Sequence, residues 1–257
     1  MEQYILDKYN AWIANANVAP LEKEILKNYS QDEILECFGA DLEFGTAGIR
    51  GVMGLGTNRM NTYVVRQATQ GLAQYLLKHF NKPSVAIAYD SRNNSEKFAK
   101  EAASVLAANG IKVYIYRELM PVPSLSFAVR YLKTSAGVVV TASHNPKQYN
   151  GYKVYGSDGC QMTPDAAKEV LRNIREIDVF SGVKRSSFAI EMSNETIEYI
   201  SEKVIEKYYE SVLSQSIKSE KVSPRILNIT YTPLHGAGLK PVTTILDRDG
   251  FKNIDIV

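Results

Sequence analysis

The stretch PSVAIAYDSRNNSEKFAKEAASVLAANGIKVYIY, residues 83–116, holds an apolar run, a helical repeat and a second apolar run. The run from Val85 to Tyr89 is short and bounded by turn signals, which is typical of a buried strand. Residues 95–109 place apolar side chains at helical spacing, and Gly110 stands where a left-handed helix cap is expected. Ile111–Tyr116 reads as the next strand, so the stretch predicts a β-α-β unit.

The flanking sequence extends this unit on both sides. Residues 62–80 repeat the helical pattern before it. After it, Pro121 and Pro123 precede a helix that runs to about Leu132, and the apolar run Gly137–Val140 follows. Three apolar runs separated by helices predict an α/β fold with an open, largely parallel sheet.

The two ends of the chain predict further elements. Residues 1–40 read as helices, and the polar, serine-rich residues 180–195 read as a boundary loop. An amphipathic helix is expected over 196–213, then a strand over 225–231, a helix ending near Gly250 and a last strand over 253–257. We expect a first domain over 1–195 and an incomplete second domain over 196–257. Because such a domain stops after one β-α-β unit, we expect a fragment of a longer protein. The alternative is a natural short chain that ends on an edge strand.

Composition excludes several classes of protein. The 257 residues are 45% hydrophobic and 23% charged, which excludes disorder as the main theme. A net charge of +2 gives no sign of a nucleic-acid or membrane-surface partner. No apolar run approaches the length of a transmembrane helix, and no signal peptide is expected from the first residues. Cys37 and Cys160 have no metal-ligand spacing, so a reduced, cytoplasmic protein is expected.

Ser143 is the sharpest chemical signal. It lies in Thr141-Ala-Ser-His-Asn-Pro146, directly after a predicted buried strand. Ligands of open parallel sheets sit beyond the carboxyl ends of the strands. His144 offers an imidazole beside the hydroxyl, and Lys153 is expected to return to the same edge on one arm (152–155) of a hairpin whose other arm is 160–162. The alternative is a polar turn in which His144 bonds a backbone carbonyl.

The glycine-studded segment 44–56 holds one cation, Arg50. It is expected to be a loop, since its glycines at 45, 48, 51, 54 and 56 disfavour a helix or a strand interior. Backbone amides with few side chains can approach an anion, and arginine binds phosphate in a bidentate way. The segment matches neither a P-loop nor a dinucleotide fingerprint. An ordinary surface arginine is the alternative for Arg50.

Other polar residues are expected to be structural. Asp90-Ser-Arg92 follows a strand, where it either contacts the Ser143 loop or only caps the next helix, and the capping turn is the simpler interpretation. His235 is expected to bond a loop carbonyl, with a substrate as the alternative. His79, near a helix end, is expected to be solvated or favoured by the helix dipole. Trp12 reads as a packing residue.

Three motifs together resemble the α-D-phosphohexomutase superfamily of phosphoglucomutases and phosphomannomutases. They are FGTAGIRG (44–51), TASHNPxxYNGYK (141–153) and YTPLHGAG (231–238), and the resemblance covers about residues 40–257. The long helical N-terminus and MGLGTNRM (53–60) look closest to the longer phosphoglucomutase/phosphopentomutase branch. The resemblance implies a three-layer α/β/α first domain with a mixed, largely parallel sheet, followed by the opening β-α-β of a similar second domain.

The resemblance also implies a phosphoenzyme that interconverts hexose 1-phosphate and hexose 6-phosphate, small-molecule sugar phosphates, through a bisphosphate. Ser143 would carry the phosphate and hold Mg²⁺ through it, while His144, Lys153 and Arg50 would lie at the transferring group. Glucose 1,6-bisphosphate would be the activator. The family's Asp-x-Asp-x-Asp-Arg metal loop and its sugar-binding loop do not occur in these 257 residues, so the remaining Mg²⁺ ligands are expected beyond Val257. The similar-looking Asp247-Arg-Asp-Gly250 reads as a helix end, and little or no turnover is expected from this chain alone.

Three alternatives stay open. A phosphopentomutase of the same superfamily would share these motifs. A serine hydrolase would use Ser143 against an acyl group, although no G-x-S-x-G elbow surrounds it. A non-catalytic phosphosugar-binding module would bind the same ligands without transferring phosphate.

Overall fold

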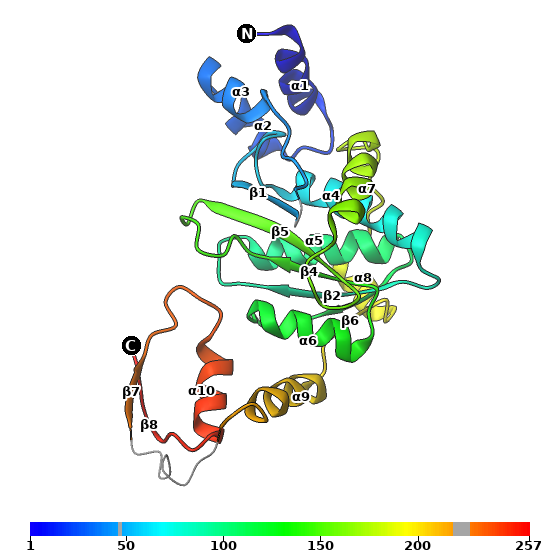
Figure 1. Ribbon diagram of the computed structural model, residues 1–257. Coiled ribbons are helices and arrows are strands. Elements are labelled where there is room, and N and C mark those ends of the chain that lie inside the picture. The colour runs from blue at the N-terminus through cyan, green and yellow to red at the C-terminus, as the bar shows by residue number, and fades with distance from the viewer. Residues whose placement is uncertain (46–47, 218–226) are drawn as a thin grey trace.

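A computed structural model describes residues 1–45, 48–217 and 227–257, and its centre is a six-stranded sheet (Figure 1). The strand order is β1-β5-β4-β2-β3-β6. The expected β-α-β unit is confirmed: β2 (Ser84–Tyr89) pairs in parallel with β3 (Lys112–Ile115) across α5 (Ser95–Ala108). On its other side β2 pairs in parallel with β4 (Ala136–Val140). The sheet is therefore parallel through its middle.

Two antiparallel strands complete one edge of the sheet. β5 (Tyr149–Gly156) pairs with β4, and β1 (Gly48–Val52) pairs with β5. The loop expected over 44–56 is thus wrong for its middle, where the structure has a strand. The expected second hairpin arm at 160–162 reduces to a single bridge between Tyr155 and Gln161, since β5 takes its main partners from β4 and β1. The sheet is mixed and largely parallel, as expected.

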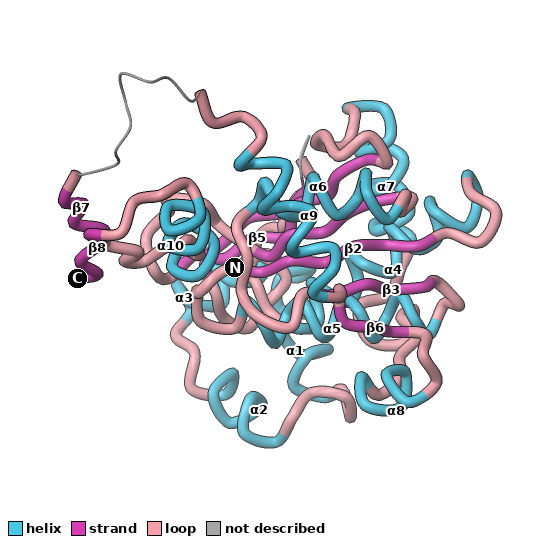
Figure 2. Tube along the Cα trace, turned by 90° about the horizontal axis from the view of Figure 1, so that it is seen from below, coloured by secondary structure: helices cyan, strands magenta, loops and turns pink. Residues whose placement is uncertain are grey.

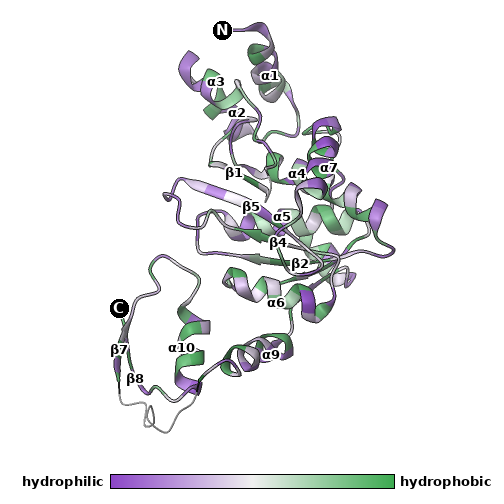
Figure 3. Cartoon of the chain, viewed as in Figure 1, coloured by the Kyte–Doolittle hydropathy of each residue, from purple (hydrophilic) through white to green (hydrophobic). Residues whose placement is uncertain are grey.

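The sheet lies between two layers of helices, which confirms the three-layer prediction. Alternate residues of β2 enter opposite cores: Val85 and Ile87 one, Ala86 and Ala88 the other. The first core is closed by α4 (Thr62–His79), α5 and α7 (Pro164–Glu176), and the second by α6 (Val122–Leu132) and α9 (Glu202–Leu213). Figure 3 shows apolar residues along the central strands and on α5 and α6.

The N-terminal helices pack beside this domain on an aromatic cluster. They are α1 (Gln3–Ala14), α2 (Pro20–Lys27) and α3 (Gln31–Phe38). Trp12, which is 2% exposed, makes edge-to-face contacts with Phe38, Tyr63 and Phe180 at centroid distances of 5.7, 5.1 and 5.4 Å. The structural role expected for Trp12 is confirmed, because these rings join α1 to α3, to α4 and to the segment after α7.

Residues 180–213 differ from expectation in two places. The boundary loop contains α8 (Phe188–Ser193), and β6 (Ile197–Tyr199) pairs in parallel with β3. The helix expected from residue 196 therefore begins only at Glu202. The division between domains at residue 195 stays a prediction, and the pairing of β6 places residues 197–199 with the first domain's sheet.

The C-terminal segment forms a separate small unit. β7 (Asn228–Tyr231) and β8 (Asn253–Ile256) pair in parallel across α10 (Leu239–Arg248), at a distance from the larger sheet (Figure 2). Residues 225 and 226 of the expected strand lie outside the described residues. Asp247–Gly250 is the expected helix end. Arg248 binds Glu206 at 2.6 Å, which ties the unit to α9. Among the described residues, no helix is long and apolar enough to cross a membrane.

Candidate functional site

The Ser143 loop begins where β4 ends, at the carboxyl edge of the parallel strands. Its neighbour β2 ends at the same edge, and the Asp90 N–H donates to the Val140 carbonyl at 3.2 Å. The loop runs from 141 to 148 and leads into β5, so both of its ends are held by the sheet. Ser143 and His144 are exposed. The sequence placed both residues correctly at this edge.

Ser143 has an unusual backbone conformation that its neighbours hold in place. Its φ is 57°, in the left-handed region that non-glycine residues seldom adopt. Its N–H donates to the Thr141 hydroxyl at 3.0 Å, and that hydroxyl donates to Asp90 Oδ2 at 2.6 Å. The Ser143 Oγ lies 3.3 Å from His144 Nδ1. Such a conformation presents an exposed hydroxyl on a fixed turn, with an imidazole as its neighbour.

Arg50 and Lys153 lie on the neighbouring antiparallel strands β1 and β5. Arg50 pairs with Gly151, two residues from Lys153 on β5, so the two cations lie on the same face of the sheet. The Arg50 Nη1 donates to Asn145 Oδ1 of the Ser143 loop at 2.9 Å. The four residues expected at the site, Ser143, His144, Lys153 and Arg50, thus come from β1, β5 and one loop. Two cations at this edge make it suited to an anion.

The electrostatics of Lys153 differ from those of a surface lysine. Burial of the ammonium group, followed by repulsion from Arg50, lowers its pKa from the ordinary value of 10.5, and Asp90 offsets part of this. A lysine with a lowered pKa can exchange a proton closer to neutral pH.

Replacing Lys153 with methionine is expected to stabilise the fold near pH 7. Because the folded pKa lies below the unfolded one, the unfolded chain binds more protons between the two values, and stability rises with pH there. Methionine removes this partly buried charge, so its unfolding midpoint in urea should exceed the wild-type midpoint at about pH 7 and approach it at about pH 10. Lys147→Met, at an exposed lysine of the same loop, is the control. A Lys153→Met midpoint below wild type at both pH values would contradict this.

Arg92 and Asp90 are the site residues that the sequence interpretation undervalued. The simpler helix-capping turn is only part of the structure: Asp90 Oδ1 does accept from the Ser95 hydroxyl at 2.6 Å, and also from the Arg92 N–H. The Arg92 guanidinium, however, donates to carbonyl oxygens of the Ser143 loop, including that of Ser143 at 2.8 Å. Contact with the loop was one of the two alternatives, and the signal for it was a charged triplet directly after a strand.

The described residues do not complete a magnesium site. No group of three or more His, Cys, Asp or Glu side chains among them is placed to hold a metal ion. Asp90, at the base of the loop, already binds Thr141, Ser95 and Arg92 through its two oxygens. Magnesium prefers carboxylate and phosphate oxygens, so within the described residues only a phosphate on Ser143 would contribute a ligand.

Two pockets lie near α5, and only one of them is next to the Ser143 loop. A groove of about 900 Å³ lies between the carboxyl edge of the sheet and the C-terminal unit, and Arg92, Asn145 and Lys147 line it together with His235. The Ser91 hydroxyl donates to the carbonyl oxygen of His235 there at 2.9 Å. The groove therefore opens beside the Ser143 loop and has the size of a small-molecule site.

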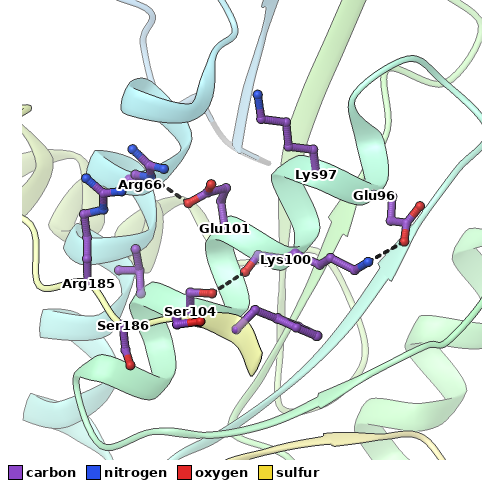
Figure 4. Close-up of a pocket in the computed structure, with 11 residues that line it drawn as sticks. Arg66, Glu96, Lys97, Lys100, Glu101, Ser104, Arg185 and Ser186 are labelled. Atoms are coloured by element: carbon purple, nitrogen blue, oxygen red, sulfur yellow. Dashed lines mark hydrogen bonds and ion pairs between the residues drawn. The ribbon is translucent and has the colours of Figure 1, made fainter. Parts of the chain in front are cut away.

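The other pocket, of about 490 Å³, is lined by α4, α5 and the segment before α8 (Figure 4). Two of its cations are already paired: Arg66 with Glu101, and Lys100 with Glu96, each at 2.6 Å. It includes no residue of the Ser143 loop, so it is not the site that the sequence predicts.

The chain is similar to known proteins over most of its length. The family described as "Phosphoglucomutase/phosphomannomutase, alpha/beta/alpha domain I" matches residues 41–180. A phosphoglucomutase of Staphylococcus haemolyticus is 40% identical over 221 residues, which are 86% of this chain and 39% of that protein. A phosphoglucomutase of Staphylococcus saprophyticus is 38% identical over 245 residues, 95% of this chain and 44% of that protein. The chain thus spans less than half the length of these relatives.

The fold has relatives among solved structures. A phosphoglucomutase/phosphomannomutase family protein from Burkholderia thailandensis superposes with a TM-score of 0.60 at 22% identity, over 83% of this chain and 43% of that one. At this identity the likeness concerns the fold alone.

Proposed function

This chain belongs to the phosphoglucomutase/phosphomannomutase family, and on that premise we propose that Ser143 carries the phosphoryl group that interconverts hexose 1-phosphate and hexose 6-phosphate. One observation supports this most: an exposed serine hydroxyl, on a fixed left-handed turn, stands at the sheet edge to which Arg50 and Lys153 also belong. The relatives that carry the name phosphoglucomutase match most of this chain.

The proposed reaction needs a serine that both gives and receives phosphate. The phosphorus–oxygen bond to the Ser143 Oγ breaks while a sugar hydroxyl forms the new bond, which gives a sugar bisphosphate. The bisphosphate then returns its other phosphoryl group to Ser143, and the product leaves as the isomeric monophosphate. Such transfers depend on positioning and on cations near the phosphoryl oxygens.

The residues around Ser143 suit the parts of this reaction. The Arg50 guanidinium, held by Asn145, offers a fixed positive charge for phosphoryl oxygens. Lys153, whose pKa is lowered, can exchange a proton with the sugar hydroxyl. His144 Nδ1, beside the Ser143 Oγ, is placed to bond the serine oxygen as the phosphoryl group leaves.

The proposed function includes a magnesium cofactor, an activator and a cellular location. Magnesium would bind the phosphate on Ser143, and glucose 1,6-bisphosphate would be the activator. The described residues alone do not complete the metal site. A cytoplasmic location accords with Cys37 and Cys160, which are both free thiols.

Mass spectrometry of the purified chain tests the proposal. After incubation with glucose 1,6-bisphosphate and magnesium, the chain is expected to gain about 80 Da, and peptide mapping should place this phosphate on Ser143. Phosphate found only on residues other than Ser143 would count against the proposed role.

A further inference from the structure

Arg92 makes an unusual number of bonds to the Ser143 loop. It stands just after β2, and its side chain is 13% exposed. Its guanidinium donates to four carbonyl oxygens, those of Ser143 (2.8 Å), Asn145 (2.6 Å), Pro146 (3.0 Å) and Tyr149 (3.1 Å). Its Nε lies 3.4 Å from Asp90 Oδ2, which balances the charge. One side chain therefore ties the start of the loop to the first residue of β5.

These bonds fix the direction of the peptide groups in the loop. In a trans peptide the C=O and the following N–H point in opposite directions. Because the Ser143 carbonyl points at Arg92, the N–H of His144 points away from it. None of the hydrogen bonds between described residues uses that N–H, whereas the Ser143 N–H is taken by Thr141. The His144 N–H is therefore left for a ligand, and both His144 and Ser143 are exposed.

We propose that Arg92 is a positioning residue, which orients the Ser143–His144 peptide so that the His144 N–H binds the phosphoryl group on Ser143. This rests on the proposed phosphoserine. Arg92 itself is turned toward the carbonyl oxygens, so it acts on the phosphate through the loop. A backbone N–H held in this way stabilises anionic oxygen without any rearrangement during transfer.

Lysine cannot replace arginine in this role. A guanidinium presents five donors in one plane, whereas an ammonium offers three donors at one point. Arg92→Lys keeps the positive charge near the loop but cannot reach all four carbonyl oxygens. The variant therefore distinguishes the effect of peptide orientation on the phosphate from the effect of the side-chain charge.

The test uses chains in which phosphoserine is incorporated at position 143 during synthesis, so it does not depend on phosphoryl transfer. Phosphorus NMR then measures the second pKa of the phosphoserine, which is about 6 in the absence of special contacts. A hydrogen bond to the dianion lowers this pKa. We expect a lowered pKa in the wild-type chain and a higher one in Arg92→Lys and Arg92→Ala. Arg130→Ala, which removes an arginine bonded to the Ser126 carbonyl on α6, should match wild type.

The outcomes separate this inference from the proposed function. An Arg92→Lys chain that is folded and has the wild-type phosphoserine pKa would overturn the role of Arg92. If Arg92→Ala fails to fold, the Lys variant still decides, and hydrogen exchange at the His144 amide gives a second measurement. Exchange at that amide should be slowed by the phosphate in wild type and less so in Arg92→Lys. Failure of the proposed function would instead appear as phosphate that the unmodified chain acquires only on residues other than Ser143.

Discussion

Replacing Ser143 with alanine is expected to remove all phosphate that the chain acquires from glucose 1,6-bisphosphate. The side chain of Ser143 is the exposed hydroxyl of the loop, and its backbone is held independently by Thr141 and Arg92. Loss of the hydroxyl should therefore leave the loop in place and delete only the phosphoryl acceptor. Intact-mass spectrometry would show no gain of about 80 Da in the variant.

Two further variants sharpen this expectation. Ser143→Gly removes the same hydroxyl with a residue that favours the positive φ of 57°, so it should also lose the phosphate and remain as stable as wild type. Ser91→Ala removes a hydroxyl that donates to the His235 carbonyl at the same groove, and it should keep the phosphate. Phosphate retained in both Ser143 variants would contradict the assignment.

The reactivity of Ser143 also distinguishes the mutase hypothesis from the serine hydrolase hypothesis. In serine hydrolases the histidine is oriented by an acidic residue. Among the described residues, the hydrogen bonds give His144 no carboxylate partner, and its imidazole lies next to Ser143 in sequence. A fluorophosphonate probe should accordingly leave Ser143 unlabelled, and labelling would revive the acyl-transfer alternative.

The central strands were predictable because a strand that is buried on both faces consists mainly of consecutive apolar residues. β2 and β4 are covered on both faces and read as short apolar runs. β6 was missed since its three residues fall inside a helical repeat, in which Ile197 and Ile200 are both buried. Only the pairing with β3, more than eighty residues earlier, makes these residues a strand.

The residues expected to take part in the reaction could be predicted from the sequence, but the residue that holds their loop in place could not. Ser143, His144 and Lys153 stand in one continuous motif, so their approach follows from a single loop and strand. Arg92 binds that loop across 51 residues of sequence, and a local pattern shows only a charged turn. A long-range contact of this kind depends on β2 and β4 being neighbours, which periodicity does not reveal.

Strand β1 was missed because its glycines were taken as signs of a loop. Glycine is depleted in strands, since it packs no side chain and loses much entropy. At Gly48 the close approach of β5 outweighs this: a Cβ there would lie 1.9 Å from the Tyr152 carbonyl oxygen. Gly151, opposite Arg50, is similarly confined by the carbonyl oxygens of Thr141 and Ile49. The glycines thus let β1 bring Arg50 to the Ser143 loop.

Replacing Gly48 with alanine is therefore expected to cost at least about 3 kcal/mol of folding stability, because strain and a backbone clash act together. Its φ of 123° is a conformation that side chains rarely adopt, and the contacted carbonyl belongs to the strand that pairs with β1. Relief requires β1 to leave β5. Unfolding in urea, followed by circular dichroism, measures the loss.

Gly110→Ala is a control for a positive φ without a backbone clash. Gly110 also has a positive φ, 77°, but a Cβ there would meet no atom within 4 Å. Its replacement should cost only the conformational strain of a left-handed residue, about 1–2 kcal/mol. Equal losses of folding stability in the two variants would mean that β1 can move away from β5 at no cost in free energy. A larger loss at Gly48 would mean that the close pairing of β5 with β1, the strand that carries Arg50, leaves no room for a Cβ at this position.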